Sequence, residues 1–151
     1  MRIIATLVEL KTLVGQEIAV SDWIAITQER VQLFADATGD QQWIHTDVER
    51  SRAESPFGGT VAHGFLTLSL LPMLMESAVT MRDVKMAVNY GLNKVRFTAP
   101  VLVGSRLRGR ISVLAVDDIA GGAQVIWQIT VEREGSDKPV CVAELISRRY
   151  S

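Results

Sequence analysis

Two histidines and one aspartate are the residues of this sequence best suited to acid–base chemistry. His45 and His63 are its only histidines, and both lie in an irregular stretch, residues 39–64. Asp40 precedes His45 by five residues, and a loop of that length can turn both side chains toward one water molecule. An imidazole titrates near neutral pH, so a carboxylate beside it makes a usable acid–base pair. The alternative, a turn aspartate and a structural histidine, stays open on spacing alone.

A second candidate feature is the pair His63-Gly64, which begins a long apolar segment. Free N–H groups and the positive end of the dipole lie at a helix N-terminus, where they suit a developing oxyanion. Gly64 has no side chain to obstruct a ligand. The pattern equally fits a simpler alternative, in which Gly64 only lets the helix pack closely against its neighbours.

Other classes of site find little support in the sequence. Two histidines with Asp40 or Asp47 form a sparse ligand set, so we expect no metal. There is no Walker loop, no dinucleotide-binding fingerprint and no Gly-x-Ser-x-Gly motif. The net charge is −1, from 16 basic and 17 acidic residues, which does not suit a nucleic-acid partner. The single cysteine, Cys141, excludes an internal disulfide framework.

Length and composition indicate one globular domain spanning residues 1–151. Hydrophobic residues make up 48% of the chain and charged residues 22%. The longest apolar stretch, 64–79, is interrupted by polar residues and by Pro72, so we expect no membrane span. The N-terminus lacks the pattern of a signal peptide. We therefore expect a soluble cytoplasmic protein from a reducing compartment.

The first half of the chain shows helical periodicity and most of the loop signals. Thr27 can cap a helix, and Gly39 supplies the left-handed turn that ends one. Residues 41–62 are expected to form a loop with one helical turn near 47–52. The elements expected before that loop are a short helix from Leu7 to about Gly15, a strand at 23–26 and a helix at 28–37.

The second half of the chain alternates between apolar and polar residues. The expected strands are 84–97, with a bulge at Gly91, then 106–116, 123–134 and 140–150. The segment 64–78 is apolar on nearly every side, so a helix there must be wrapped by other structure. Pro72 should kink or shorten that helix. The sequence therefore predicts an α+β fold, in which a curled antiparallel sheet surrounds a buried helix.

Four motifs in this order resemble the MaoC-like dehydratase family, which contains the (R)-specific enoyl-CoA hydratases, also called hydratase 2. The likeness covers nearly the whole chain and is strongest to the nodulation-protein-N-like branch. The motifs are Phe34–Asp40 (FADATGD), Ile44–Asp47 (IHTD), Ala62–Leu70 (AHGFLTLSL) and Asn89–Phe97 (NYGLNKVRF).

The resemblance implies a hot-dog fold, a homodimer joined through its sheet edges, and acyl tunnels near the dimer interface. It places Asp40 and His45 on the family's catalytic dyad, and His63-Gly64 on the motif that begins the central helix. The sequence departs from the family's usual Asp-x-Asn-Pro-x-His run, because Gln42 and Trp43 replace the Asn and Pro. The remaining candidate substrate-binding residues are Phe57, Thr60, Tyr90, Gly91 and Phe97.

The function that this resemblance implies is reversible hydration of a trans-2-enoyl-CoA to an (R)-3-hydroxyacyl-CoA. Coenzyme A would be part of the substrate, and no separate cofactor is expected. Two alternatives stay open. One is a hot-dog acyl-CoA thioesterase, for which Glu76 is the only acidic residue on the central helix. The other is a non-catalytic acyl-CoA-binding module.

Overall fold

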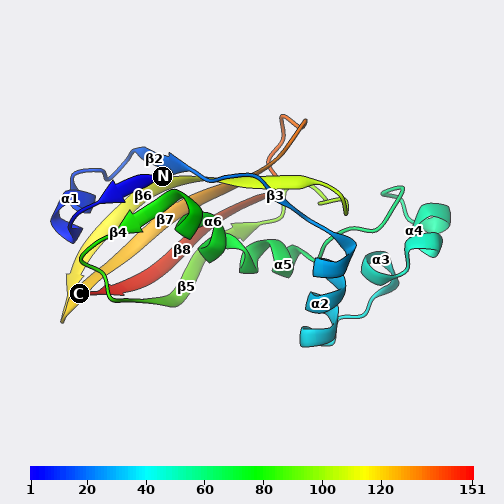
Figure 1. Ribbon diagram of the computed structural model, residues 1–151, viewed down its shortest axis with the longest axis horizontal. Coiled ribbons are helices and arrows are strands. Elements are labelled where there is room, and N and C mark those ends of the chain that lie inside the picture. Colours follow the sequence, from blue (N-terminus) through cyan, green and yellow to red (C-terminus); the bar gives the residue numbers. More distant parts are fainter.

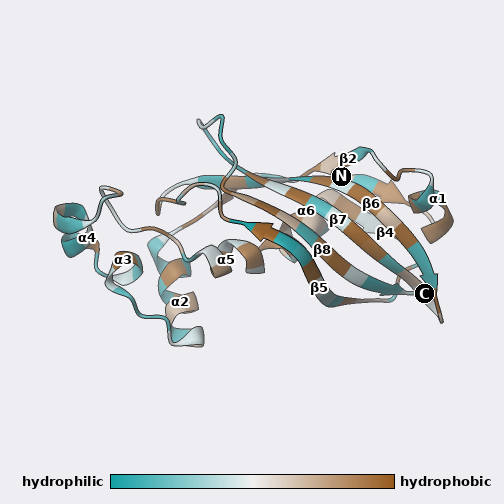
Figure 2. Ribbon diagram, turned by 180° about the vertical axis from the view of Figure 1, so that it is seen from behind, coloured by the Kyte–Doolittle hydropathy of each residue, from teal (hydrophilic) through white to brown (hydrophobic).

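The alternating runs of the second half form the body of a curled antiparallel sheet. The computed structural model describes all 151 residues, and the sheet contains six strands in the order β2-β6-β7-β8-β5, with β3 also paired to β6. Hydropathy alternates along β7 and β8 (Figure 2), which buries one face of each strand. The strands are β2 (Glu17–Val20), β3 (Ile24–Ala25), β5 (Met86–Arg96), β6 (Arg106–Ile119), β7 (Gly122–Arg133) and β8 (Cys141–Tyr150).

The apolar segment beginning at Gly64 lies in the curl of the sheet, as two short helices rather than one (Figure 1). Helix α5 (Gly64–Ser69) ends at Leu70, and α6 (Leu71–Ala78) begins directly after it. Pro72 stands in the first turn of α6, where its missing N–H costs little. The sequence predicted that Pro72 would either kink or shorten one long helix. The structure shows shorter helices, with Pro72 in the first turn of the second one.

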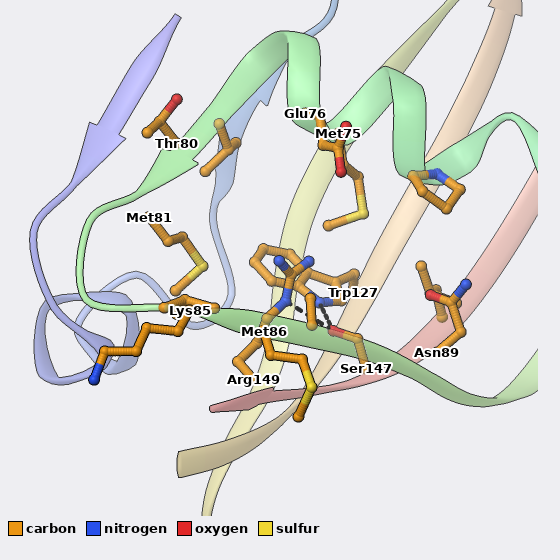
Figure 3. A pocket seen from close by; sticks show the side chains of 15 residues that line it. Met75, Glu76, Thr80, Met81, Lys85, Met86, Asn89, Trp127, Ser147 and Arg149 are labelled. Atoms are coloured by element: carbon orange, nitrogen blue, oxygen red, sulfur yellow. Dashed lines mark hydrogen bonds between the residues drawn. The ribbon is translucent and has the colours of Figure 1, made fainter. Parts of the chain in front are cut away.

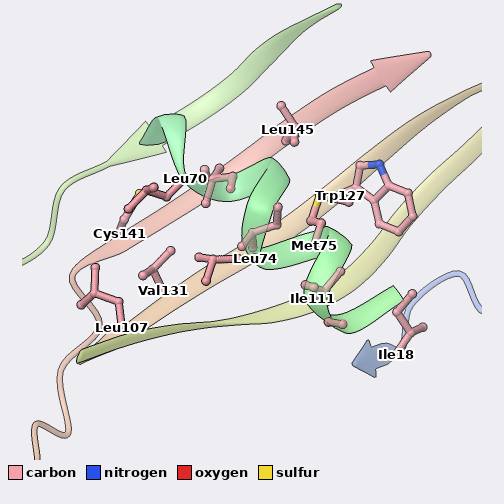
Figure 4. Close-up of a cluster of buried hydrophobic side chains, with 14 of the residues drawn as sticks. Ile18, Leu70, Leu74, Met75, Leu107, Ile111, Trp127, Val131, Cys141 and Leu145 are labelled. Atoms are coloured by element: carbon pink, nitrogen blue, oxygen red, sulfur yellow. The ribbon is translucent and has the colours of Figure 1, made fainter. Parts of the chain in front are cut away.

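The core forms between these helices and the concave face of the sheet (Figure 4). Leu74 and Met75 of α6 pack in one cluster with Ile111 of β6, Trp127 of β7 and Leu145 of β8. All five are less than 9% exposed, and Ile111 and Trp127 are fully buried. Burial of apolar area on this scale is the main force that holds the sheet around the helices.

The N-terminal segment differs from expectation. Strand β1 (Arg2–Ile4) pairs in parallel with β4 (Val79–Met81), which follows α6 directly. Such three-residue strands carry too little alternation to be predicted. The first helix, α1, covers only Leu7–Lys11, because the backbone N–H of Gly15 donates to Val113 of β6 instead of closing a helix end.

Three helices gather beyond one end of the sheet, close to the start of α5 (Figure 1). They are α2 (Gln28–Thr38), α3 (Trp43–Thr46) and α4 (Val48–Glu54). Helix α2 is capped by Thr27 as predicted, and the turn predicted near 47–52 is α4 with Asp47 as its cap. Helix α3 was not predicted. The junction of α2, α3 and α5 brings the sequence-predicted site together.

Strand β5 forms the edge of the sheet and pairs only with β8. Its register shifts between Asn89 and Gly91, which confirms the predicted bulge. The strand leaves large apolar side chains exposed, namely Met86, Val88, Tyr90 and Leu92. A long apolar edge of this kind is unusual on a monomer, because it offers free backbone groups for pairing.

Candidate active site

A tight turn after α2 places Asp40 at the site. Gly39 ends the helix with φ of 82°, a left-handed conformation that glycine adopts without a steric penalty. The chain therefore reverses at that residue, and Asp40 follows it on the surface. The Asp40 Oδ1 accepts a long hydrogen bond of 3.4 Å from the backbone N–H of Gln42, which leaves most of the carboxylate free.

The loop from Asp40 to His45 is held without the family's usual proline. Trp43 begins α3, and its carbonyl accepts a hydrogen bond of 3.2 Å from the buried Ser51 hydroxyl of α4. The guanidinium carbon of Arg50 lies 4.1 Å from the Trp43 ring centre, a cation–π distance. Contacts between α3 and α4 thus position His45, in place of the backbone restraint that a proline supplies.

His45 is buried, with 7% of its surface exposed. Its Nδ1 lies 2.6 Å from the carbonyl oxygen of Val61, so Nδ1 carries the proton and donates. In the neutral ring the lone pair is then on Nε2, which is the nitrogen able to accept a proton. The Val61 carbonyl therefore selects the tautomer of His45 that can act as a base.

Burial lowers the pKa of His45 below 6.5, and the neighbouring His63 lowers it further. The hydrogen bond to Val61 and the nearby Asp40 carboxylate act in the opposite direction, and the net shift is downward. His45 is therefore neutral at pH 7.

This shift makes the stability of the fold depend on pH. Between the folded pKa and 6.5, the unfolded chain binds more protons than the folded chain, so the free energy of unfolding falls as pH drops through that window. We expect His45→Gln to lose this component. Urea unfolding of both proteins at about pH 7.5 and about pH 5.5 measures it. Identical pH dependence in the two proteins would contradict the assignment of the shift to His45.

Asp40, His45 and His63 converge on one point. A carboxylate oxygen of Asp40 and one ring nitrogen of each histidine lie within 4.8 Å of one another. Two hydrogen bonds of about 2.8 Å that meet at a water oxygen span roughly 4.6 Å. The three atoms are therefore close enough to share one water molecule. The spacing of about 3.4 Å between ligand atoms of a tetrahedral zinc also falls within this limit.

The side chain of His63 supports the other two residues. It is 2% exposed, and its Nε2–H donates to the backbone carbonyl of Asp40 at 3.0 Å. Its ring stacks on that of His45 with 3.8 Å between centres, and Phe34 of α2 packs at 4.8 Å. The Nδ1 of His63 is buried and has no partner. His63 thus ties the Asp40 turn to α5 and orients the His45 ring.

Helix α5 begins at Gly64 with His63 as its N-cap, as the sequence predicts. The backbone N–H groups of Gly64 and Phe65 donate to no group of the protein. A Cβ at Gly64 would lie 2.9 Å from the Phe97 ring, so only glycine fits beneath that ring. Both readings of Gly64 therefore apply, since it leaves free amides and also permits close packing.

A cavity of about 370 Å³ opens beside the residues that adjoin His45. Three of the predicted substrate-binding residues, Phe57, Gly64 and Phe97, line it together with Ile44 and Val61. Asp40, His45 and His63 do not themselves line it. Most of the lining is apolar, so the cavity can hold an apolar group against Gly64 at the start of α5.

Thr60 does not line this cavity. It is buried, and its hydroxyl donates to the Gln28 side chain at 2.6 Å. Gln28 in turn donates from Nε2 to the carbonyl of His45 at 2.7 Å. Thr60 therefore positions α3 through Gln28. The sequence did not indicate a role for Gln28, because nothing in its context distinguishes it from other helical glutamines.

Tyr90 and Gly91 also lie apart from the cavity beside His45. They line a second one of about 390 Å³, with Leu68 and Ser69 of α5. Glu76, on which the thioesterase alternative depends, lines a third cavity under α6 and is not brought near Asp40. The structure therefore offers no carboxylate on the central helix beside the site.

The chain matches the model of the MaoC like domain over residues 9–134. It belongs to the MaoC-like domain family. A similar protein is 3-hydroxyacyl-thioester dehydratase Z of Mycobacterium tuberculosis, which is 55% identical over 149 residues, or 98% of each chain. Nodulation protein N of Rhizobium leguminosarum bv. viciae is 45% identical over 145 residues, covering 94% of this chain and 89% of that protein.

Solved structures show the same fold. An R-hydratase from Pseudomonas aeruginosa superposes with a TM-score of 0.76 at 24% identity, covering 97% of this chain and 86% of its own. The (R)-hydratase from A. caviae has a TM-score of 0.72 at 20% identity, with 89% and 94% covered. The predicted hot-dog fold is thereby confirmed. No helix of the structure is both long and apolar enough to cross a membrane.

Proposed function

We propose that this protein is an (R)-specific enoyl-CoA hydratase, which adds water reversibly to a trans-2-enoyl-CoA. The observation that carries the proposal is that the Asp40 carboxylate and the neutral His45 ring lie close enough to share one water molecule. An apolar cavity lies nearby, and its lining includes Gly64, whose backbone N–H is free. The 55% identity to a protein named 3-hydroxyacyl-thioester dehydratase supports the same reaction class.

In this mechanism Asp40 and His45 hold the attacking water. Its oxygen forms a bond to C3 of the enoyl thioester, and one of its protons passes to the pair. The pair then returns one proton to C2, so Asp40 and His45 end in the protonation states in which they began. Hydration transfers no electrons, and the chemistry therefore calls for no redox cofactor. Acid–base catalysis of this kind typically contributes about 10²–10⁴-fold to a rate.

Negative charge moves onto the thioester oxygen as water attacks. The free N–H groups of Gly64 and Phe65 are the donors placed to receive it. The Phe97 ring lies over Gly64 and would turn aside to admit the thioester. A single donor of this type is typically worth about 10²–10³-fold in rate.

The proposal includes a homodimer formed through β5. The free edge of β5 and the exposed side chains of Val88, Tyr90 and Leu92 are the features that support it. Pairing two β5 edges would satisfy the unpaired backbone groups and cover these apolar side chains. The second cavity, lined by Tyr90, would then lie at the dimer interface.

Rates and product chirality on a panel of trans-2-enoyl-CoA thioesters test the proposal. We expect hydration, with a product that an (R)-specific 3-hydroxyacyl-CoA dehydrogenase oxidises and an (S)-specific one does not. Oxidation by the (S)-specific enzyme would overturn the stereochemical assignment. Release of free thiol would instead indicate a thioesterase, and binding without turnover would indicate a non-catalytic module.

A further inference from the structure

A third cavity, of about 480 Å³, lies between α6 and the sheet (Figure 3). Helix α2, which Asp40 follows, lies toward the other end of the molecule (Figure 1). Its walls come from α6, β4, β5, β7 and β8. Unlike the cavity beside His45, it contains charged side chains, namely Glu76, Lys85 and Arg149. Glu76 and Lys85 are exposed, and the Lys85 ammonium points away from the cavity (Figure 3), so Arg149 is the cation that faces it.

Arg149 is the distinctive residue of this cavity. The inward-facing residues of β8 alternate through Leu145, Ser147 and Arg149, so Arg149 points toward the core (Figure 3). Its Nε–H donates to the Ser147 hydroxyl at 3.2 Å, and the Ser147 hydroxyl also accepts from Trp127 at 2.9 Å. Ser147 therefore holds the guanidinium at a fixed place.

The terminal nitrogens of Arg149 are left without partners. The residue forms no ion pair with any carboxylate, and its other contact is with the Trp127 ring, whose centre is 5.3 Å away. Burial lowers the pKa of Arg149, and Glu76 only partly offsets this. A guanidinium stays charged at neutral pH, so its two terminal nitrogens, which carry four N–H donors, have no acceptor in the protein.

The cavity connects back toward the catalytic end of the molecule. It shares Pro72, Asn89 and Leu145 with the second cavity, which reaches Leu68 of α5. Glu76 follows Gly64 by twelve residues, a rise of roughly 18 Å along helices. Thr67 of α5 lines the cavity at Gly64, and the next residue, Leu68, lines the second cavity, although the two cavities share no residue. An extended aliphatic chain with its thioester at Gly64 that passes between Thr67 and Leu68 would be long enough to end beside Arg149.

We propose that this cavity receives the distal end of a long acyl chain and that Arg149 binds a carboxylate there. The inference rests on the proposed hydratase function and specifies its substrate class as ω-carboxyacyl thioesters. Two features of the cavity select this chemistry. A planar guanidinium whose two terminal nitrogens are both free matches a carboxylate bidentately. One carboxylate also neutralises the charge of that guanidinium.

The test compares trans-2-enoyl-CoA thioesters of increasing chain length, each with its ω-carboxyl counterpart. We expect no preference among short chains, and a rise in kcat/KM of roughly 10- to 100-fold for the ω-carboxyl form once the chain reaches Arg149. Absence of such a preference at every length would overturn the inference, even where the plain thioesters are hydrated. Failure to hydrate any plain thioester would instead refute the proposed function.

Arg149→Gln should abolish the ω-carboxyl preference, and Arg149→Lys should keep only part of it. Arg133→Gln is the matched control, because Arg133 of β7 lines none of the three cavities and forms no ion pair. A preference that survives Arg149→Gln would contradict the assignment. Laurate is included as a competitor, because a free fatty acid carries the same carboxylate. Two results together would overturn the inference: laurate inhibits the parent protein but not Arg149→Gln, and no ω-carboxyl substrate is preferred. Arg149 would then bind free fatty acids and not the end of the substrate.

Discussion

Replacing Asp40 with asparagine is expected to reduce kcat/KM for hydration of crotonyl-CoA by about 10²–10⁴-fold. The amide is nearly isosteric, so the turn after Gly39 and the bond from His63 to the Asp40 backbone are retained. The amide cannot take up or return a proton at neutral pH. The loss should therefore appear in kcat more than in KM.

The control for this variant is Glu29→Gln, which changes an exposed carboxylate in the first turn of α2, the helix that precedes Asp40. It makes the same change of charge away from the site, and its rate should match that of the parent protein. A thermal unfolding midpoint close to the parent's would show that Asp40→Asn is folded. A folded Asp40→Asn protein with the parent's rate would remove Asp40 from the mechanism.

His45→Gln is expected to produce a loss of similar size. The substitution removes the Nε2 lone pair that accepts the proton, and it removes the tautomer-selecting bond from Nδ1 to Val61. Loss of that buried bond should also lower the free energy of unfolding by about 1 kcal/mol. Urea unfolding measures the change in the free energy of unfolding separately from the change in hydration rate. A loss of about 1 kcal/mol leaves most of the molecules folded under assay conditions, so the slower rate would come from the missing base.

A substitution at His63 tests whether His45 or His63 transfers the proton. His63→Phe keeps a ring to stack on His45 and removes the donor to the Asp40 carbonyl together with the unpartnered Nδ1. Its loss of activity should be smaller than that of His45→Gln, because we assign His63 the role of positioning the pair. The reverse order of effects would assign the proton-transfer role to His63.

Much of the fold follows from local signals in the sequence. The alternation in β6, β7 and β8 predicts a one-sided sheet, and the all-round apolar segment after Gly64 predicts the element that the sheet must enclose. Thr27 and Gly39 mark the ends of α2 within a residue. These features are predictable because each depends on neighbours in the chain.

The features that could not be predicted depend on contacts between distant segments. The pairing of β1 with β4 joins the N-terminus to the residues after α6, and neither strand is long enough to show a pattern. In the site, the spacing of Asp40 and His45 suggested a shared water. The stacking of His63 on His45 and the link from Thr60 through Gln28 arise only when α2, α3 and α5 meet.

The central claim is that Asp40 and His45 act together on one water molecule, and a double-variant comparison tests it most directly. Initial rates of crotonyl-CoA hydration are measured for Asp40→Asn, His45→Gln and the protein that carries both changes. Residues that act as a unit show strongly non-additive losses. We therefore predict that the double variant is about as slow as the slower single variant. Losses that multiply, or a single variant that keeps the parent's rate, would contradict the claim.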